Sequence, residues 1–351
     1  MTPRDALRLL QSEIIQVAGC TEPAAIAFAF RTLIRLGAAP PDPRRPARLE
    51  VSRDAFRNAS TAVVPRLNVP GILAAAAAGL ASKADTFNVF ADFDLRRARA
   101  FMKQPDWLQT APVRRTGLWV RLRLAPDSEI LLQGRHDHIQ RLIVNGRDRT
   151  PRPPVLPPPP SLDDAFALAR TRHPKLEALA LDFITRQVPS EKGFALIDQV
   201  ARRVAGRMAG YAHPVMTITG SGNQGIFLAL PYRHLHARQG DAILPAVVFS
   251  LLAQVHLSHR HNRLSSECGL ATKAAPALAA GLAFARGASP AAIRHLFRDI
   301  PSRIGPLPCE GAEPVCGDKA RRALQAVIDD PSWPAEFSAS PPRATGRPAK
   351  S

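Results

Sequence analysis

The sequence predicts an α+β protein, with a mixed sheet mainly in the N-terminal part and a helix-rich C-terminal part that carries the cysteines. Three observations predict this class. Residues 147–161, RDRTPRPPVLPPPPS, are nearly half proline, and proline fixes φ and lacks an amide donor, so they form an extended connector. Before the connector, short segments show strand-like alternation or β-rich composition. After it, apolar residues recur mainly at helical spacing.

The connector divides the chain into a predicted N-terminal α+β part, residues 1–146, and a mainly helical part, residues 162–330. Residues 331–351 are rich in Pro, Ser and Ala and are predicted to form a disordered tail.

Individual elements follow from local patterns. Helices are predicted over residues 5–18 and 21–36, the second with Thr21 as N-cap and Pro23 in its first turn. The apolar run 72–81 predicts a core helix. Strands are predicted at 47–53, 88–95, 117–124, 129–134 and 138–146. Later helices are predicted at 161–173, 175–187, 192–209, 240–258, 269–286, 289–299 and 317–329.

The charge of +18 does not predict a specific nucleic-acid partner, because the arginines are scattered and form no basic block or basic-aromatic platform. The start MTPRDALRLLQSEIIQ has no apolar signal-peptide core, and the longest apolar runs are too short to span a bilayer. We therefore expect a cytoplasmic protein without a membrane partner. Thiols stay reduced there, which argues against two disulfides among the four cysteines.

Two segments carry local chemistry. Cys20 precedes a predicted helix, and the amides of a helix N-terminus lower the pKa of a nearby thiol. The alternative is a small buried residue at a helix entry. The segment GSGNQG, residues 220–225, has the glycines to turn backbone amides onto a carboxylate or another small anion. An ordinary tight loop is its alternative interpretation.

Cys268, Cys309 and Cys316 form the strongest constellation. Three thiolates match an iron–sulfur cubane with one iron left open, whereas structural zinc sites usually have four ligands. Three unrelated buried thiols remain the alternative. The histidine clusters HDH (136–138), HLH (234–236) and HLSHRH (256–261) lack the glutamate of a metalloprotease motif and are interpreted as solvated or core residues.

Several motifs in order resemble those of the iron–sulfur L-cysteine desulfidases, a family related to the alpha part of bacterial iron–sulfur L-serine dehydratases. VAGCTEPAAIA is similar to a GCTEP segment, TGSGNQGI to SGSGNQGI, and NRLSSECGLATKAA to RLSALCGC. FRNASTAVVP, GRHDHI and CEGAEPVCGDKA resemble KNA…IPG, HTNI and CDGAKxxCALK. The resemblance covers residues 12 to 327. VPRLNVPG replaces the family's PGTG, HDH replaces HTN, and Glu310 and Glu313 stand for Asp and Lys.

The resemblance implies a [4Fe–4S] cluster with one open iron, held by Cys268, Cys309 and Cys316. Cys20 would be the base for the Cα proton. Cys20 and Cys316 both remain candidates for the third ligand, and the short loop joining Cys309 to Cys316 favours Cys316. The residues implied in substrate binding lie in three segments: Glu22; Asn58; and Ser221, Gly222, Asn223 and Gln224.

The implied enzyme is a carbon–sulfur lyase that converts L-cysteine to pyruvate, ammonia and hydrogen sulfide. L-serine deamination on the same cluster is the alternative activity, because the altered loops leave the preferred amino acid open. A catalytically degenerate binding protein and a zinc-bound structural protein also remain open. The expected partner is a small amino-acid substrate, and a homodimer is compatible with the sequence.

Overall fold

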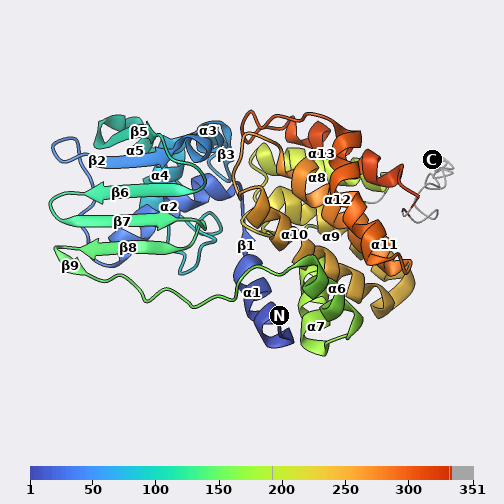
Figure 1. Cartoon of the computed structure of the whole chain (residues 1–351). Coiled ribbons are helices and arrows are strands. Elements are labelled where there is room, and N and C mark those ends of the chain that lie inside the picture. Colours follow the sequence, from blue (N-terminus) through green and yellow to red (C-terminus); the bar gives the residue numbers. More distant parts are fainter. Residues whose placement is uncertain (192, 332, 334–351) are drawn as a thin grey trace, which may run out of the picture.

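The computed structural model describes residues 1–191, 193–331 and 333. One lobe of the molecule contains a sheet backed by helices, and the other lobe is helical (Figure 1). The predicted α+β class is confirmed, with Cys268, Cys309 and Cys316 in the helical lobe. The predicted tail, residues 331–351, lies almost entirely outside the described residues.

The main sheet has six strands within the described part of the chain. β2 pairs in parallel with β5, and every other neighbouring pair is antiparallel. The strands in spatial order are β5 (Leu108–Val113), β2 (Ala47–Ser52), β6 (Trp119–Leu124), β7 (Ser128–Gln133), β8 (Ile139–Val144) and β9 (Arg147–Asp148).

Four of the five predicted strands are confirmed as β2, β6, β7 and β8. The strand predicted at 88–95 is wrong. That segment consists mainly of turns and bends, with one isolated bridge between Ser82 and Phe93. Its apolar residues Val89, Phe90 and Phe93 are buried, so the β-rich composition reflects burial rather than strand pairing.

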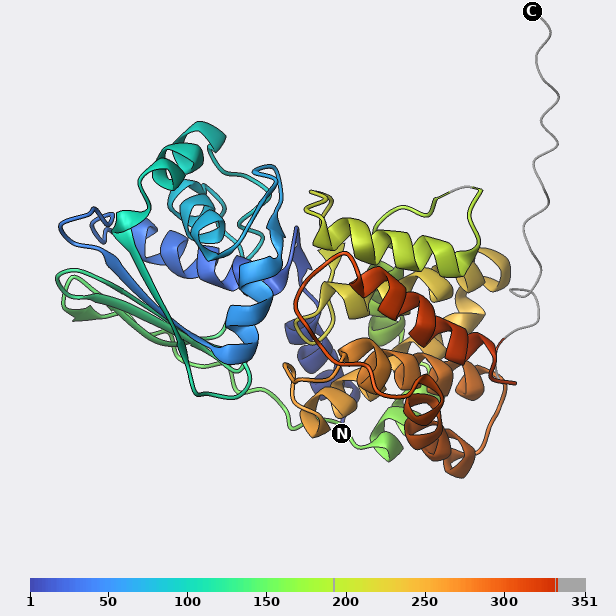
Figure 2. The ribbon, with the colours of Figure 1, turned by 90° about the horizontal axis from the view of Figure 1, so that it is seen from above.

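Helices cover one face of this sheet (Figure 2). They are α2 (Thr21–Arg35), α3 (Arg53–Thr61), α4 (Ile72–Ala81) and α5 (Leu95–Lys103). α4 is the predicted alanine-rich core helix, and it lies against α2. A Cβ atom at Gly79 would lie 2.4 Å from the Ala27 carbonyl oxygen, so the close approach of the two helices requires glycine there. The N-cap of α2 is Cys20 rather than the predicted Thr21.

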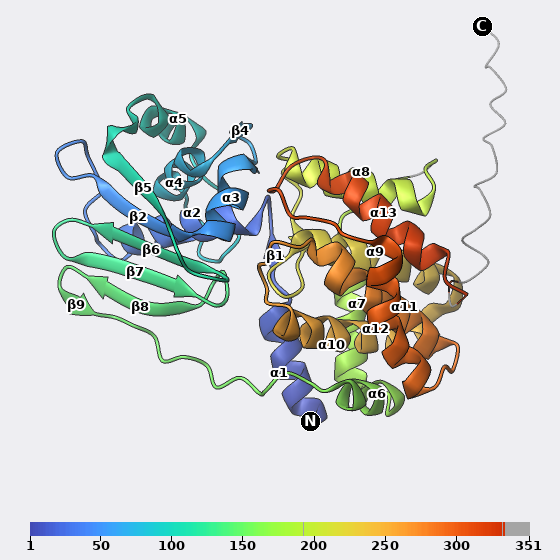
Figure 3. The ribbon, with the colours of Figure 1, turned by 45° about the horizontal axis from the view of Figure 1, so that its top comes forward.

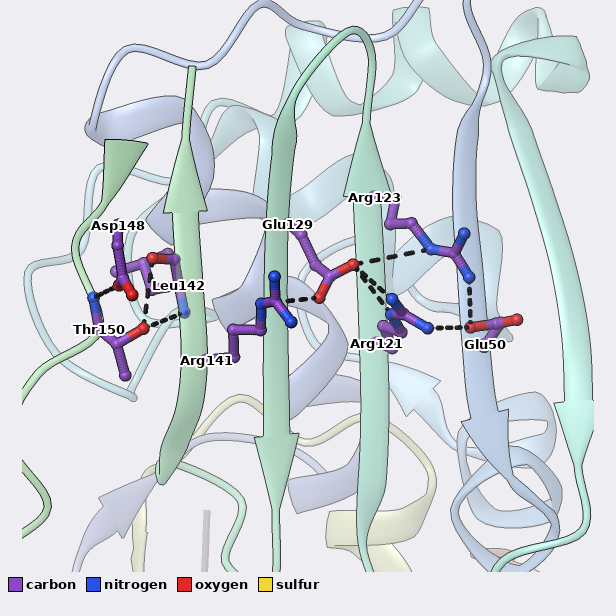
Figure 4. A network of polar contacts seen from close by, with 8 residues as sticks. All are labelled: Glu50, Arg121, Arg123, Glu129, Arg141, Leu142, Asp148 and Thr150. Atoms are coloured by element: carbon purple, nitrogen blue, oxygen red, sulfur yellow. Dashed lines mark hydrogen bonds and ion pairs between the residues drawn. The ribbon is translucent and has the colours of Figure 1, made fainter. Parts of the chain in front are cut away.

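The opposite face of the sheet carries a charged network centred on Glu129 (Figure 4). Its Oε2 atom accepts hydrogen bonds from Arg121 Nε at 3.0 Å and Nη2 at 2.7 Å. Arg123 lies 3.9 Å away and Arg141 lies 3.5 Å from Oε1. Glu50 lies at ion-pair distance from both Arg121 and Arg123. Two carboxylates, on β2 and β7, therefore pair with three arginines on β6 and β8.

We expect Glu129→Gln to lower the free energy of unfolding by about 1–2 kcal/mol, because it removes one charge shared among three arginines. Glu177→Gln is the matched control, because Glu177 is equally buried but pairs with Arg172 alone. Urea unfolding at low and high salt measures the free energy of unfolding of both variants. High salt should reduce the loss caused by Glu129→Gln, because it screens the charges. Equal losses in the two variants would show that the network adds nothing to a single pair.

The helical lobe contains the predicted C-terminal helices. They are α6 (Leu162–Arg170), α7 (Pro174–Thr185), α8 (Leu196–Met208), α9 (Gly222–Gln239), α10 (Leu244–Arg260), α11 (Ala275–Ala285), α12 (Pro290–Ile304) and α13 (Cys316–Ile328). Short helical turns η2 (Gly240–Ile243) and η3 (Leu270–Ala274) precede α10 and α11, and η1 (Pro105–Trp107) precedes β5. Of these eight helices, α9 was not predicted.

α9 and α10 form the one helical stretch of the described residues that is both long and apolar enough to cross a membrane. By length and composition, residues 222–260 are sufficient to cross a membrane, but 72% of the most apolar window is buried inside the protein. This burial is typical of a core helix. It also explains why α9 was missed, since a helix surrounded by protein has no polar face and Pro231 interrupts the pattern.

The first residues of the chain lie with the helical lobe. α1 (Pro3–Glu13) contacts α7 and α10, and β1 (Gln16–Val17) pairs with β10 (Val215–Met216). The chain then enters the sheet lobe, where β3 (Val63–Val64) pairs with β4 (Val69–Pro70). It returns through the extended connector between β9 and α6 (Figure 3). The division into folding units at 146 and 162 stays a prediction.

Candidate active site between the two lobes

A cavity of about 100 Å³ lies where the lobes meet, and all four cysteines line it. Cys20 and Glu22 come from the start of α2 and Asn58 from α3, whereas Cys268, Cys309 and Cys316 come from the helical lobe. The other lining residues with polar side chains are Thr21, His136, Arg207, Thr219, Ser221, Asn223, Gln224, Arg263, Ser265, Glu267 and Lys273. Both lobes therefore contribute to one site.

Cys20 and Glu22 form a buried hydrogen-bonded pair. The Cys20 thiol donates to Glu22 Oε2 at 2.9 Å. Burial raises the pKa of Cys20 well above its usual value, and the negative charge of Glu22 raises it further, while Arg207 opposes the shift. The prediction of a thiol pKa lowered by the helix N-terminus is therefore wrong in this structure, because burial outweighs the helix amides.

Glu22 is held as a carboxylate by several donors. Burial alone would raise its pKa, but His136 and the Cys20 thiol lower it to about 2. His136 Nε2 lies 3.6 Å from Oε1, just beyond a hydrogen bond. Asn58 Nδ2 donates to Oε1 at 3.3 Å, and Thr21 Oγ1 donates to Oε2 at 3.2 Å. Glu22 thus links the thiol of Cys20 to the side chain of Asn58.

The low pKa of Glu22 predicts a loss of stability in acid. Its folded pKa of about 2 lies below its ordinary value of 4.5. The carboxylate therefore stabilises the fold above pH 4.5, and this contribution is lost as the pH falls toward about 2. We expect the free energy of unfolding to fall less steeply with acid in Glu22→Gln. Urea titrations of both proteins in the same cofactor state measure it. Parallel pH profiles would contradict the assignment.

Cys268 and Cys309 are brought together by two paired segments. The Cys268 amide donates to the Leu307 carbonyl, and the Cys309 amide donates to the Ser266 carbonyl, both at 2.8 Å. Cys316 begins α13, and its thiol faces the Gly311 carbonyl at 3.6 Å. The loop between Cys309 and Cys316 also reaches the sheet lobe, where the Ala312 amide donates to Thr61 Oγ1 at 3.0 Å.

The three thiols also interact electrostatically. Burial raises the pKa of Cys268 to about 11, and the nearby Cys316 and Cys309 add to the increase. The pKa of Cys316 is raised by burial and by Cys309. Cys20 belongs instead to a small apolar cluster with Ala62, Met208 and Ala312, against which Cys316 packs. Of the three later cysteines, Cys316 therefore interacts with Cys268 and also packs against the apolar cluster that contains Cys20.

Three cations surround these thiols. Lys273 is buried beside Cys268 and Cys309, and burial lowers its pKa to about 8. Its Nζ donates to the Asn262 carbonyl at 2.6 Å. Lys319 Nζ donates to the Pro308 carbonyl at 2.7 Å and to Glu310 at 3.0 Å. Arg207 is the third cation, with Cys20, Glu22 and Cys316 in its electrostatic range. Their positive charge favours deprotonated thiols in the cavity.

The donor set fits an iron–sulfur cubane better than a single ion. Within residues 1–191, 193–331 and 333, no three His, Cys, Asp or Glu side chains are placed to hold one metal ion. In a cubane each cysteine binds a different iron, so the sulfurs stand farther apart than around one zinc ion. Here three thiols line one cavity with cations beside them, which is a donor set that a cubane could use.

The GSGNQG segment forms another part of the cavity wall. Thr219 and Gly220 have positive φ values, and Ser221 then caps α9 by accepting a hydrogen bond from the Gln224 amide. The N-terminus of an 18-residue helix therefore meets the cavity, where its amides favour an anion. Ser221, Asn223 and Gln224 line the cavity, but Gly222 does not.

His136, Arg207 and Lys273 are polar cavity residues that the sequence interpretation missed. His136 lies in the GRHDHI segment, so the motif resemblance held a signal for it. Lys273 follows Cys268 by five residues in the quoted CGLATK segment. Arg207 lies in the ordinary helix α8, and nothing in its local sequence distinguishes it from the exposed arginines.

Comparisons with known proteins agree with the motif resemblance at a coarse level. Residues 177–329 match the family described as serine dehydratase alpha chain. The matched segment contains α8, α9, Cys268, Cys309 and Cys316, and therefore most of the cavity's helical side. Residues 177–329 are thus similar to the serine dehydratase alpha chains at the superfamily level.

Similar proteins over most of the chain have UPF0597 names. The UPF0597 protein of Lachnoclostridium phytofermentans is 27% identical and aligns with 91% of this chain and 86% of its own. The UPF0597 protein of Thermosipho melanesiensis is 24% identical, and the alignment covers 86% of this chain and 82% of the relative. The UPF0597 protein of Oleidesulfovibrio alaskensis is 34% identical, but the alignment covers only 35% of this chain and 29% of the relative. These names state no activity, and no solved structure matches the chain significantly.

Proposed function

We propose that the protein is an iron–sulfur-dependent lyase that eliminates the β-substituent of a small L-amino acid, with L-cysteine as the substrate. One observation carries this proposal. A single cavity combines three interacting thiols, a thiol–carboxylate pair and the N-terminus of a long helix. An α,β-elimination needs a group that binds the leaving atom, a base, and a site for the carboxylate.

Cys268, Cys309 and Cys316 would hold a [4Fe–4S] cluster. When bound, the open iron of the cluster supplies a Lewis acid. The chain itself keeps the thiols on one side of the cavity through the paired segments around Cys268 and Cys309. Lys273, Lys319 and Arg207 offset the negative charge of the thiolates.

The carboxylate of the substrate would lie at the N-terminus of α9, beside Ser221 and Asn223. As a thiolate, Cys20 would take the Cα proton, and the electron pair of the broken Cα–H bond would form the Cα–Cβ double bond as sulfide leaves with the electron pair of the Cβ–S bond. The released enamine hydrolyses in water to pyruvate and ammonia. Arg207 and the amides at the start of α2 favour the Cys20 thiolate, against the effects of burial and Glu22.

Glu22 positions the Cys20 side chain through the hydrogen bond that it accepts while Cys20 is a protonated thiol. Asn58 connects the same carboxylate to the cluster side, because its amide donates to Glu22 and its Oδ1 lies 4.0 Å from Cys309 Sγ. Either residue would also accept or orient the substrate ammonium. L-serine deamination in the same cavity is the second candidate, favoured by the match to serine dehydratase alpha chains.

Anaerobic purification tests the proposal. We expect about four irons and four sulfides per chain, broad visible absorbance, and pyruvate with hydrogen sulfide from L-cysteine. A comparison of the specificity constants for L-cysteine and L-serine separates the two activities. A coloured protein without turnover of either would favour a degenerate binding protein. Zinc or no metal would refute the cluster.

A further inference from the structure

Arg207 is a buried cation with two unsatisfied hydrogen-bond donors among the described residues. It lies on α8 and is 4% exposed. Its Nη1 donates to Asn223 Oδ1 at 2.9 Å. Nε and Nη2 are buried and have no hydrogen-bond partner among the described residues, and Arg207 forms no ion pair in that part of the chain. Unsatisfied donors on a buried charge are costly, so this position indicates a missing anionic partner.

The free side of Arg207 has the shape of a carboxylate-binding fork. The N–H bonds of Nε and Nη2 run parallel in the guanidinium plane and can donate two hydrogen bonds to the oxygens of one carboxylate. Arg207 lines the cavity next to Asn223, the second residue of α9. A carboxylate there would meet both the guanidinium and the amides at the start of that helix.

The surroundings hold Arg207 in this orientation. Asn223 occupies the one nitrogen that is not part of the fork. A Cβ atom at residue 222 would lie 2.5 Å from both Cζ and Nε of Arg207, so Gly222 leaves the space in which the guanidinium lies. This explains why Gly222, predicted as a substrate residue, belongs to the site without lining the cavity.

We propose that Arg207 binds the α-carboxylate of the substrate and restricts the site to α-amino acids. This inference rests on the proposed function, because it names the group that the cavity recognises. Cys20 and Cys316 both lie within the electrostatic range of Arg207. A carboxylate on the fork therefore lies in the same cavity as the candidate base and the cluster-binding thiols.

The test compares L-cysteine with cysteamine, which has the same amine and thiol but no carboxylate. Arg207→Met, Arg207→Lys and wild type are purified without oxygen, and binding of both compounds is measured by calorimetry. Visible spectra are recorded in parallel. Arg202→Met is the matched control, because Arg202 is an exposed arginine on the same helix.

We expect Arg207→Met to weaken L-cysteine binding roughly 10- to 100-fold and leave cysteamine binding and the spectrum unchanged. Arg207→Lys should retain part of the affinity, because lysine keeps the charge without the fork. Equal losses for both compounds, no loss for L-cysteine, or a changed spectrum with unchanged discrimination would overturn the proposal. Carboxylate-dependent binding without turnover in wild type would refute the proposed reaction while supporting this inference.

Discussion

Cys268→Ser is expected to remove the visible absorbance of the anaerobically purified protein and to lower turnover by at least about 100-fold. Cys268 is the thiol that interacts with both Cys309 and Cys316 and is fixed by the backbone pairing with Leu307. A serine hydroxyl is a poor ligand for iron–sulfur clusters, which are held by thiolates. Iron and sulfide analysis with the visible spectrum measures the first effect, and pyruvate release measures the second.

Ser266→Ala is the control for this experiment. Ser266 lies on the same segment, but its side chain is exposed and its backbone carbonyl supports Cys309. The control should keep colour and activity. A fully coloured and active Cys268→Ser protein would refute the cluster assignment. Zinc in place of iron would instead support a structural role for the cysteines.

Cys20→Ala is expected to keep the visible absorbance and lose turnover by roughly 10²- to 10⁴-fold, the contribution of a positioned base. Cys20 donates to Glu22 and is absent from the electrostatic group formed by the other three thiols. Its removal should therefore spare the cluster. The measurements are the visible spectrum and the rate of pyruvate release at saturating L-cysteine.

The companion variant is Cys316→Ala, which should lose its colour. If Cys20→Ala loses the absorbance and Cys316→Ala keeps it, Cys20 is the third ligand. The roles of the two thiols are then exchanged. The structure makes this comparison informative, because Cys316 packs against the apolar cluster that contains Cys20. Loss of colour in neither variant would contradict both assignments.

Much of the fold could be predicted because local patterns agree with tertiary burial. β6 and β7 alternate inward and outward residues, so their period identifies them. β5 was missed because it is an exposed edge strand that contains Pro112, which is typical of edges but masks strand composition. α9 was missed because burial on all sides removes the amphipathic pattern.

The site could be predicted only where the sequence itself is unusual. Four cysteines and a glycine-rich turn are conspicuous in a chain of 351 residues. Arg207 and Glu22 acquire their properties from tertiary structure, because burial and partners from other elements set the pKa of each. The same limitation explains the wrong pKa direction for Cys20. A helix N-terminus can be seen in a sequence, but desolvation by the second lobe cannot.

The chain passes between the lobes twice in the described residues, once beside β1 and once through the extended connector (Figure 3). These two connections restrict the movement of one lobe relative to the other. Residues of both lobes form the walls of the cavity. Any movement of one lobe relative to the other would therefore change the distance from Cys20 to the cysteines of the helical lobe, without any secondary structure being remade.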